Sequence, residues 1–347
     1  MQEVRVAIVG MGIGKANALA ISRNPRGRVV ALCDLLEDRM TEFAQDLPEP
    51  VQFFTDYKEM CRSREIDAVF VGTPNQFHVP VAMEALRNDK HVLVTKPLAD
   101  GEELAHQLVD VAESSGLVNM MSLSTRFSVG VQHLGQMSQR GEFGELYYAR
   151  ARSIRRQGIP AWSLGFIHKG GGAFRDMGVH VLDSAWWLLG MPEPVSVTGV
   201  AGAKFGPSGK GYFGRGTPPT PDYYNQFAAD DYGGGFIRFA NGVGLQVESF
   251  WASHQPGDVN IELFGTEAGA KLRPLTVYRM NGELEENASI HIPESTNELA
   301  WDNVAGHFID SILDGTPCAA PLRHGWLVQR MMEGLLKSAQ TGQEVRL

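Results

Sequence analysis

Residues 170–190, GGGAFRDMGVHVLDSAWWLLG, hold an acid and a histidine at a spacing suited to proton chemistry. Asp176 and His180 are four residues apart, so on a helix they share one face, one turn from each other. Three glycines precede them, and glycine lets a ligand approach the backbone closely. A structural interpretation also fits, because an acid near a helix start interacts with the helix dipole and a single histidine is usually a satisfied core residue. The spacing alone leaves both interpretations open.

A lysine lies at the point where a buried strand ends. The apolar run VLVT (92–95) is followed directly by Lys96 and Pro97, and a helix-like stretch begins almost at once. Proline fixes its own φ angle and so stiffens the turn that carries the lysine. The alternative is a surface lysine whose stem covers apolar side chains while its ammonium group reaches water.

A glycine turn near the start of the chain predicts a dinucleotide site. Its backbone would approach the pyrophosphate at a helix start, through Gly10, Gly12, Ile13 and Gly14. Lys15 stands where the usual fingerprint has its third glycine. Asp34 ends the second predicted strand, where a carboxylate accepts hydrogen bonds from ribose hydroxyls and repels a 2′-phosphate. NAD is therefore favoured over NADP, unless Asp34 is only an exposed acid at a strand end.

The elements that must position these residues alternate regularly in the first third of the chain. Apolar, strand-like runs occur at 4–10, 28–34, 66–72, 91–95 and 117–124. The segments between them carry apolar residues at helical spacing. Strands that alternate with helices predict βαβ units and a parallel sheet. We expect an α/β protein whose N-terminal Rossmann dinucleotide-binding domain spans 1–123.

The remainder, 124–347, has a different pattern. Strand-like runs occur at 145–156, 236–251, 259–265 and 276–280. Asn241-Gly242 divides the second run into a hairpin. We expect an α+β domain with a large, mostly antiparallel open sheet for substrate binding and oligomerisation. Helices on one face of such a sheet leave the other to be covered, which favours a homodimer or homotetramer. The glycine- and proline-rich residues 204–221 predict a long loop, either a mobile surface segment, a flap over the site or an arm to a neighbouring subunit.

The composition excludes several classes of partner. A formal net charge of −9 disfavours nucleic acid and anionic membrane. No run approaches the roughly 18 apolar residues of a membrane helix, and the first residues do not have the pattern of a signal peptide. The three cysteines are far apart, at Cys33, Cys61 and Cys318. We expect a soluble cytoplasmic protein with reduced cysteines and no metal site.

Several motifs together resemble the glucose–fructose oxidoreductase/inositol dehydrogenase family (Gfo/Idh/MocA). Besides the glycine turn with Asp34, the matching segments are TPNQFH (73–78), TKPLA (95–99), STRF (124–127), GGGAFRDMGVH (170–180) and SAQTGQEVRL (338–347). They span nearly the whole chain in the family's order. Thr95 stands where the family often has a glutamate before the Lys-Pro pair.

The resemblance implies a catalytic site of Lys96, Asp176 and His180, without a metal. His180 would be the general base, Lys96 would stabilise the developing alkoxide, and Asp176 would hold a neighbouring hydroxyl and orient the imidazole. A cis Lys96–Pro97 bond is also implied. Further cofactor contacts would come from Thr73, Asn75, His78, Lys96 and Pro97, although His78 fits a capping or packing role equally well. Candidate substrate contacts are Arg126, Trp162 and His168.

Three functions remain open at this stage. The favoured one is an NAD-dependent dehydrogenase that oxidises a secondary hydroxyl of a sugar, inositol or related polyol. A redox-assisted glycoside hydrolase would reduce and reoxidise NAD within one turnover and release a free sugar. A non-catalytic dinucleotide-binding sensor has no use for a proton relay, so the joint presence of Lys96, Asp176 and His180 argues against it.

Overall fold

The computed structural model describes residues 2–213, 219–293, 296 and 299–347. These residues form two compact units, Met1–Phe127 with Asn297–Gln329, and Ser128–Thr296 with Arg330–Leu347. Residues 299–329 pack with the N-terminal unit, so the units are not continuous in sequence, whereas the division expected from the sequence was 1–123 and 124–347. Within the part of the chain that the structure describes, no helix is long and apolar enough to cross a membrane.

The first unit is built on a six-stranded, fully parallel sheet with the strand order β3-β2-β1-β4-β5-β6. Its strands are β1 Val4–Val9, β2 Gly27–Cys33, β3 Gln52–Phe54, β4 Ala68–Val71, β5 His91–Val94 and β6 Asn119–Met121. The central strands are buried on both faces, which explains their unbroken apolar runs. The predicted Rossmann fold is confirmed.

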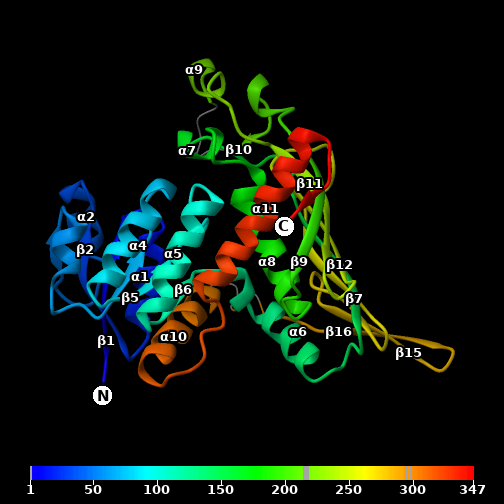
Figure 1. Ribbon diagram of the computed structural model, residues 1–347, viewed down its shortest axis with the longest axis horizontal. Coiled ribbons are helices and arrows are strands. Elements are labelled where there is room, and N and C mark those ends of the chain that lie inside the picture. Colours follow the sequence, from blue (N-terminus) through cyan, green and yellow to red (C-terminus); the bar gives the residue numbers. More distant parts are fainter. Residues whose placement is uncertain (1, 214–218, 294–295, 297–298) are drawn as a thin grey trace. The chain divides into compact units, whose positions relative to one another are not determined.

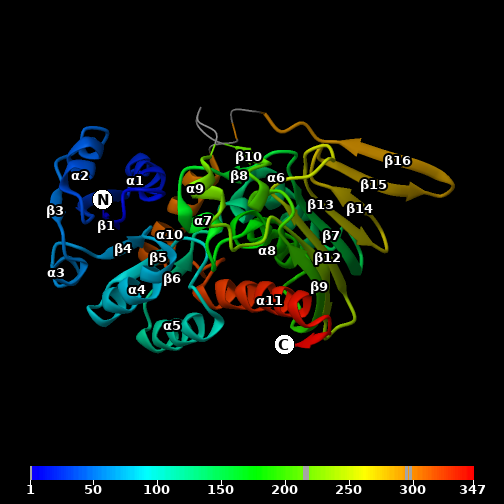
Figure 2. The same cartoon turned by 90° about the horizontal axis from the view of Figure 1, so that it is seen from above.

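Helices cover both faces of this sheet. They are α1 Gly14–Arg23, α2 Glu37–Ala44, α3 Tyr57–Cys61, α4 His78–Arg87, α5 Glu102–Ser115 and α10 Leu299–Leu313, with short 3₁₀ turns at Asn75–Phe77 and Ser124–Phe127. In Figure 2, α1 and α2 lie on one face and α3, α4 and α5 on the other. Helix α10 packs against α1. Just beyond the ends of these helices, Arg26 pairs with Asp314 at 2.8 Å.

The second unit is built on a nine-stranded sheet with the order β16-β15-β14-β13-β7-β12-β11-β9-β17. Its strands are β7 Leu146–Ile154, β9 Pro194–Gly202, β11 Tyr232–Phe239, β12 Gly244–Phe250, β13 Asp258–Gly265, β14 Gly269–Lys271, β15 Thr276–Asn281, β16 Leu284–Ser289 and β17 Val345–Arg346. Only the pairing of β12 with β7 is parallel. The mostly antiparallel sheet is therefore confirmed, and β11 and β12 form the predicted hairpin at Asn241-Gly242 (Figure 1).

The helices of this unit include the one that carries the candidate site. They are α6 Val129–Gln139, α7 Leu164–Ile167, the π-helical turn η3 Phe174–Gly178, α8 Val179–Leu188, α9 Pro221–Tyr224 and α11 Leu322–Thr341, whose first residues belong to the other unit. Helix α8 packs on β7, β12 and β13. One face of this segment, with Val179, Leu182, Trp186 and Leu189, is buried.

The predicted loop 204–221 contains short elements. Residues Gly206–Ser208 form a 3₁₀ turn, and β10 Tyr212–Phe213 pairs in parallel with β8 Ile159–Pro160. Residues 214–218 lie outside the described part of the chain.

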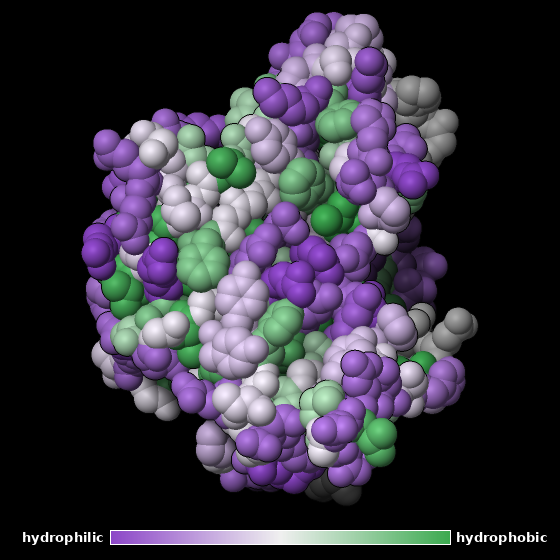
Figure 3. Space-filling model, turned by 90° about the vertical axis from the view of Figure 1, so that its right-hand side faces the viewer, coloured by the Kyte–Doolittle hydropathy of each residue, from purple (hydrophilic) through white to green (hydrophobic). Residues whose placement is uncertain are grey.

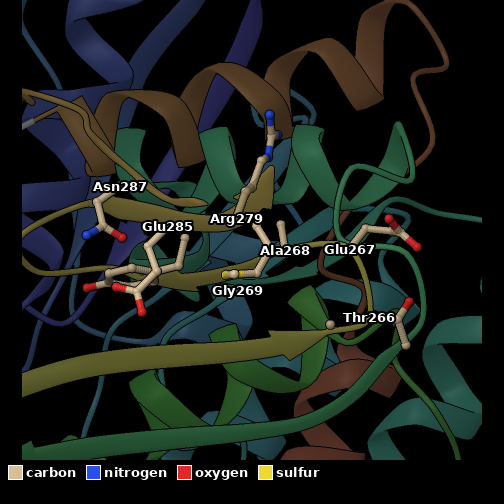
Figure 4. A pocket seen from close by; sticks show the side chains of 10 residues that line it. Thr266, Glu267, Ala268, Gly269, Arg279, Glu285 and Asn287 are labelled. Carbon is tan, nitrogen blue, oxygen red and sulfur yellow. The ribbon is translucent and has the colours of Figure 1, made fainter. Parts of the chain in front are cut away.

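The sheet face opposite α8 carries aromatic rings and ion pairs. Tyr148 packs its ring against Phe236 and Phe264, at centroid distances of 6.2 and 5.5 Å. On the same strand, Arg150 pairs with Glu262 at 2.9 Å. Figure 3 looks onto this side of the molecule, where apolar and weakly polar side chains lie among hydrophilic ones. At the outer edge, near β14–β16, a pocket is lined by Glu267, Arg279 and Glu285 and contains none of the predicted site residues (Figure 4).

Candidate functional site

The glycine turn after β1 has three glycines with three different roles. Gly10 has a φ of +90°, and a Cβ atom there would lie 2.6 Å from the carbonyl oxygen of Gly72, so only glycine fits. A Cβ on Gly12 would meet nothing within 4 Å, which leaves the space beside the backbone open. A Cβ on Gly14 would lie 2.9 Å from Ile8 Cγ2, so Gly14 allows α1 to pack closely on β1. Gly14 thus provides the close helix–strand packing that the usual fingerprint assigns to its third glycine.

Asp34 joins this turn to the end of β2. Its Oδ2 accepts a hydrogen bond from the backbone N–H of Met11 at 2.9 Å, and its Oδ1 accepts one from Leu36 N–H at 3.1 Å. Each carboxylate oxygen has two lone pairs, so both retain capacity for a further donor. The half-buried side chain lies beside the glycine turn, as an acid that receives ribose hydroxyls would.

The segment after β4 also offers a polar group to a ligand. Thr73 Oγ1 is buried and has no hydrogen-bond partner among the described residues. A buried hydroxyl without a partner is unfavourable unless a ligand or water supplies one. Asn75 begins the following 3₁₀ turn and is half-buried.

His78 has a different position from the one predicted for a cofactor contact. Its side chain is 0% exposed, and both ring nitrogens lie 2.7 Å from backbone carbonyl oxygens, Nδ1 from Pro97 and Nε2 from Thr73. Burial lowers its pKa. No polar atom of the ring remains to meet a cofactor, so the packing role left open by the sequence is the one that the structure supports.

The turn that carries Lys96 is held from two sides. The Lys96–Pro97 peptide bond is cis, as the resemblance implied. His78 binds the Pro97 carbonyl, and the buried amide of Gln329 bonds both Ala99 N–H and Ala99 C=O, at 3.1 and 2.9 Å. Gln329 was missed by sequence reasoning, because no local pattern marks a contact across 230 residues. Lys96 itself is half-buried.

Arg126 does not fit its predicted role in substrate binding. The side chain is 0% exposed, and Nη1 donates to the carbonyl of Ala319 at 2.6 Å and lies 3.1 Å from Nδ1 of His324. Burial and the Arg126 charge together lower the pKa of His324 to about 4. These contacts tie the end of the N-terminal segment to residues 319–324, so Arg126 has a structural function within the first unit.

In the second unit, Asp176 lies in the π-helical turn and His180 in the first turn of α8. The predicted helix therefore begins with a π turn and continues without a break as α8, and such single π turns occur frequently at functional sites. Both side chains are half-buried. Asp176 Oδ2 accepts a hydrogen bond of 3.0 Å from the indole N–H of Trp251, a residue that the sequence did not single out.

Two of the three glycines before this turn have a structural explanation rather than the predicted approach of a ligand, whereas a Cβ on Gly170 would meet nothing within 4 Å. Gly172 has a φ of +113°, and a Cβ there would lie 2.1 Å from Asp230 Oδ1. The other oxygen of that buried carboxylate accepts the Phe174 N–H at 3.1 Å. Burial raises the pKa of Asp230. Gly171 likewise leaves room for the backbone of Phe166, because a Cβ at position 171 would collide with the carbonyl oxygen of Phe166.

The two remaining predicted substrate contacts are accessible. The Trp162 side chain is 54% exposed and packs edge-on against Phe166, with the ring centroids 5.8 Å apart. His168 is half-buried, with Nε2 3.4 Å from Oε1 of Gln226. Both stay predictions. Among the described residues, no three His, Cys, Asp or Glu side chains are grouped to hold a metal ion.

Comparison with known proteins places the chain in a family. Residues 4–123 match the model of an oxidoreductase family with an NAD-binding Rossmann fold, and residues 131–271 match the Gfo/Idh/MocA C-terminal domain. The D-glucoside 3-dehydrogenase of Escherichia coli (strain K12) is 32% identical over 356 aligned positions, covering 99% of this chain and 97% of the relative. This chain belongs to the Gfo/Idh/MocA oxidoreductase family.

Other Gfo/Idh/MocA members are more distant. The scyllo-inositol 2-dehydrogenase (NAD(+)) of Bacillus subtilis (strain 168) is 27% identical over 267 positions, covering 76% of this chain and 72% of the relative. A solved structure of levoglucosan dehydrogenase, in complex with NADH and levoglucosan, has a TM-score of 0.83 and 20% identity, with 99% of both chains covered. At this identity the structural likeness shows the fold alone, which is the two-domain fold of the family.

Proposed function

We propose that this chain is an NAD-dependent dehydrogenase that oxidises a secondary hydroxyl of a sugar, a glycoside or a related polyol. The observation that carries the proposal is the Asp34 carboxylate, held beside the glycine turn by the Met11 and Leu36 N–H groups. A carboxylate in this position accepts ribose hydroxyls and repels a 2′-phosphate, which favours NAD over NADP. The relatives are glucoside, inositol and levoglucosan dehydrogenases, which supports the class of substrate.

The residues of the first unit fit this cofactor. The open space beside Gly12 suits a pyrophosphate, Asp34 suits the adenosine ribose, and the partnerless hydroxyl of Thr73 suits a donor or acceptor of the nicotinamide half. When bound, NAD supplies the hydride acceptor for the reaction. Asn75 and the Lys96–Pro97 turn would complete the contacts.

In the proposed reaction, two side chains act on the reacting hydroxyl and a third binds a neighbouring one. His180 takes the proton that leaves the hydroxyl oxygen, because a neutral imidazole is a suitable base near neutral pH. The Lys96 ammonium donates to the same oxygen and stabilises the negative charge that develops there. Asp176 accepts a hydrogen bond from a neighbouring hydroxyl and so selects a substrate with more than one hydroxyl group. No step needs a metal ion.

Trp162 and His168 are the proposed substrate contacts of the second unit. An exposed indole presents a flat apolar face, which suits the C–H groups of a pyranose ring. His168, six residues further along the chain, adds a polar imidazole. Its Nε2 is hydrogen-bonded to the side chain of Gln226.

We also propose that the sheet face opposite α8 binds a second copy of the chain. Its aromatic group of Tyr148, Phe236 and Phe264 would be covered in such a dimer, with ion pairs such as Arg150–Glu262 around it. Light scattering of the wild type and of Tyr148→Glu tests this: the wild type should be at least dimeric and the variant monomeric. A monomeric wild type would contradict it.

The experiment for the enzymatic proposal is reduction of NAD and of NADP, in parallel, across a panel of glycosides, free sugars, inositols and anhydrosugars. Turnover with NAD on one or a few members is expected. Release of a free sugar without net NADH would instead indicate redox-assisted hydrolysis. Tight binding of NAD with neither product would indicate a sensor.

A further inference from the structure

Trp251 follows β12 directly and is the hydrogen-bond donor to Asp176. Its side chain is 0% exposed, and Nε1 lies 3.0 Å from Asp176 Oδ2. A hydrogen bond to an ionised carboxylate is roughly twice as strong as one between neutral groups. A buried indole also has two χ angles held by packing, so the direction of this donor is well defined.

The backbone of Trp251 is held by Asp231. Its N–H donates to the carbonyl of Asp231 at 2.9 Å. The fully buried Asp231 carboxylate accepts the backbone N–H groups of Lys204, Phe205 and Gly206, at 2.7–3.0 Å. The same residue therefore anchors Trp251 and the start of the glycine-rich segment.

The indole packs in a small core separate from the main ones of the chain. The other buried members are Ile159, Ile167, Ala173, Met177, Tyr212 and Ala252. They come from α7, from the π-helical turn and the residue before it, and from the β8–β10 pair, so Trp251 shares this core with the turn that carries Asp176. Close packing on all sides prevents the ring from changing rotamer.

The π-helical turn that carries Asp176 is hydrogen-bonded to β12 and to the residues just before β11. Ser249 Oγ donates to the carbonyl of Ala173 at 2.8 Å, and Asp230 accepts the Phe174 N–H. These bonds fix the backbone of the turn, whereas the Trp251 bond acts on the carboxylate itself. An aspartate side chain has two rotatable bonds, and its terminal torsion is broad unless a partner selects one orientation.

We infer that Trp251 is a positioning residue for the proposed dehydrogenase reaction: its indole N–H fixes the orientation of the Asp176 carboxylate, and so the hydroxyl arrangement that the substrate must present. This inference rests on the proposed function of Asp176. It assigns Trp251 a role in substrate specificity, although Trp251 itself takes no part in the transfer of the hydride or the proton.

The test compares Trp251→Phe with Trp186→Phe. Trp186 is also buried, donates its indole N–H to the Pro192 carbonyl at 2.9 Å, and lies on the helix that carries His180. Both changes remove one buried donor and keep an aromatic ring, so similar decreases in Tm are expected. Trp251→Phe should lower kcat about 10- to 100-fold, because small misplacement of a reacting group is costly. Its KM for NAD should stay within about twofold, and Trp186→Phe should keep kcat within about twofold. Equal kcat values for the two variants would overturn the inference.

A spectroscopic measurement separates this inference from the proposed function. In protein labelled with ¹⁵N at the indole nitrogens, the Trp251 signal is identified by its loss in Trp251→Phe. Asp176→Asn should shift that signal and leave the Trp186 signal in place. If the wild type reduced no NAD on any substrate, the proposed reaction would fail, while the shift would still show that the indole orients Asp176. A Trp251 signal unmoved by Asp176→Asn would overturn the inference regardless of activity.

Discussion

The imidazole Nδ1 of His78 lies 2.7 Å from the carbonyl oxygen of Pro97, the residue next to Lys96. Its Nε2 lies equally close to the carbonyl of Thr73. One buried side chain therefore links the segments that follow β4 and β5, which carry the proposed cofactor contacts. The neighbouring charges are Lys96, which lowers the pKa of the ring, and Asp100, which raises it, with burial the largest influence.

Replacing His78 by leucine should remove the imidazole that lies between the two carbonyl groups. A neutral imidazole donates to one of them, and a buried carbonyl left without its donor costs about 1–3 kcal/mol, so Tm should fall clearly. The Lys96 turn would also lose one of its two side-chain anchors, and kcat should fall about tenfold or more. The control is His91→Leu, at the opposite end of β5, where Nδ1 accepts the Val118 N–H. It should lower Tm without a comparable loss of kcat. Unchanged kcat in His78→Leu would contradict the anchoring role.

Asp34→Asn should change the cofactor preference. The amide oxygen can still accept a backbone N–H, so the glycine turn should persist, but the negative charge that repels a 2′-phosphate is lost. The ratio of kcat/KM for NAD to that for NADP should fall about tenfold or more. The change Asp38→Asn, on an exposed neighbouring residue in α2, should leave this ratio unchanged. A ratio that does not move in Asp34→Asn would assign the preference to another residue.

Stability should decrease in mild acid, in part through His324. Its pKa is about 4 in the folded protein, against an ordinary value of 6.5, so between these values the unfolded chain binds more protons. The contribution of His324 to the free energy of unfolding is therefore complete above about pH 6.5 and is lost as the pH falls toward 4. Burial also lowers the pKa of His78, His91 and His307, so these residues contribute to the loss of stability in acid with the same sign. Tm measured at pH 7 and pH 5 should drop in the wild type and drop less in His324→Gln. Equal drops would exclude His324 as a contributor.

Much of the first unit could be predicted because its signals are local. The glycine turn with Asp34 and the strand that ends at Lys96 are short motifs next to apolar runs. The short β3 and α3 were missed, since β3 has three residues with little burial and so no apolar pattern. The resemblance to the family supplied the cis Lys96–Pro97 bond, which no residue pattern indicates.

The errors at the candidate site all concern tertiary contacts. Arg126 was assigned to substrate, but residues 319–324 bury it. Gly171 and Gly172 were assigned to a ligand, but Phe166 and Asp230 occupy the space beside them. Trp251 and Gln329 act on residues 75 and 230 positions away in the chain. An arginine, a glycine or a tryptophan has the same local pattern whether it meets ligand or protein, so only the fold separates the two.

The most direct test of the proposed mechanism is Lys96→Met, which keeps the length of the apolar stem and removes the ammonium group. The dissociation constant for NAD should stay within about threefold of the wild type, because methionine can pack as the lysine stem does. The rate of NADH formation on the best substrate should fall at least about 100-fold, as when a group that stabilises an oxyanion is removed. Lys58→Met, at an exposed residue of α3, should change neither quantity. Normal turnover by Lys96→Met would contradict the proposal that Lys96 acts on the substrate oxygen.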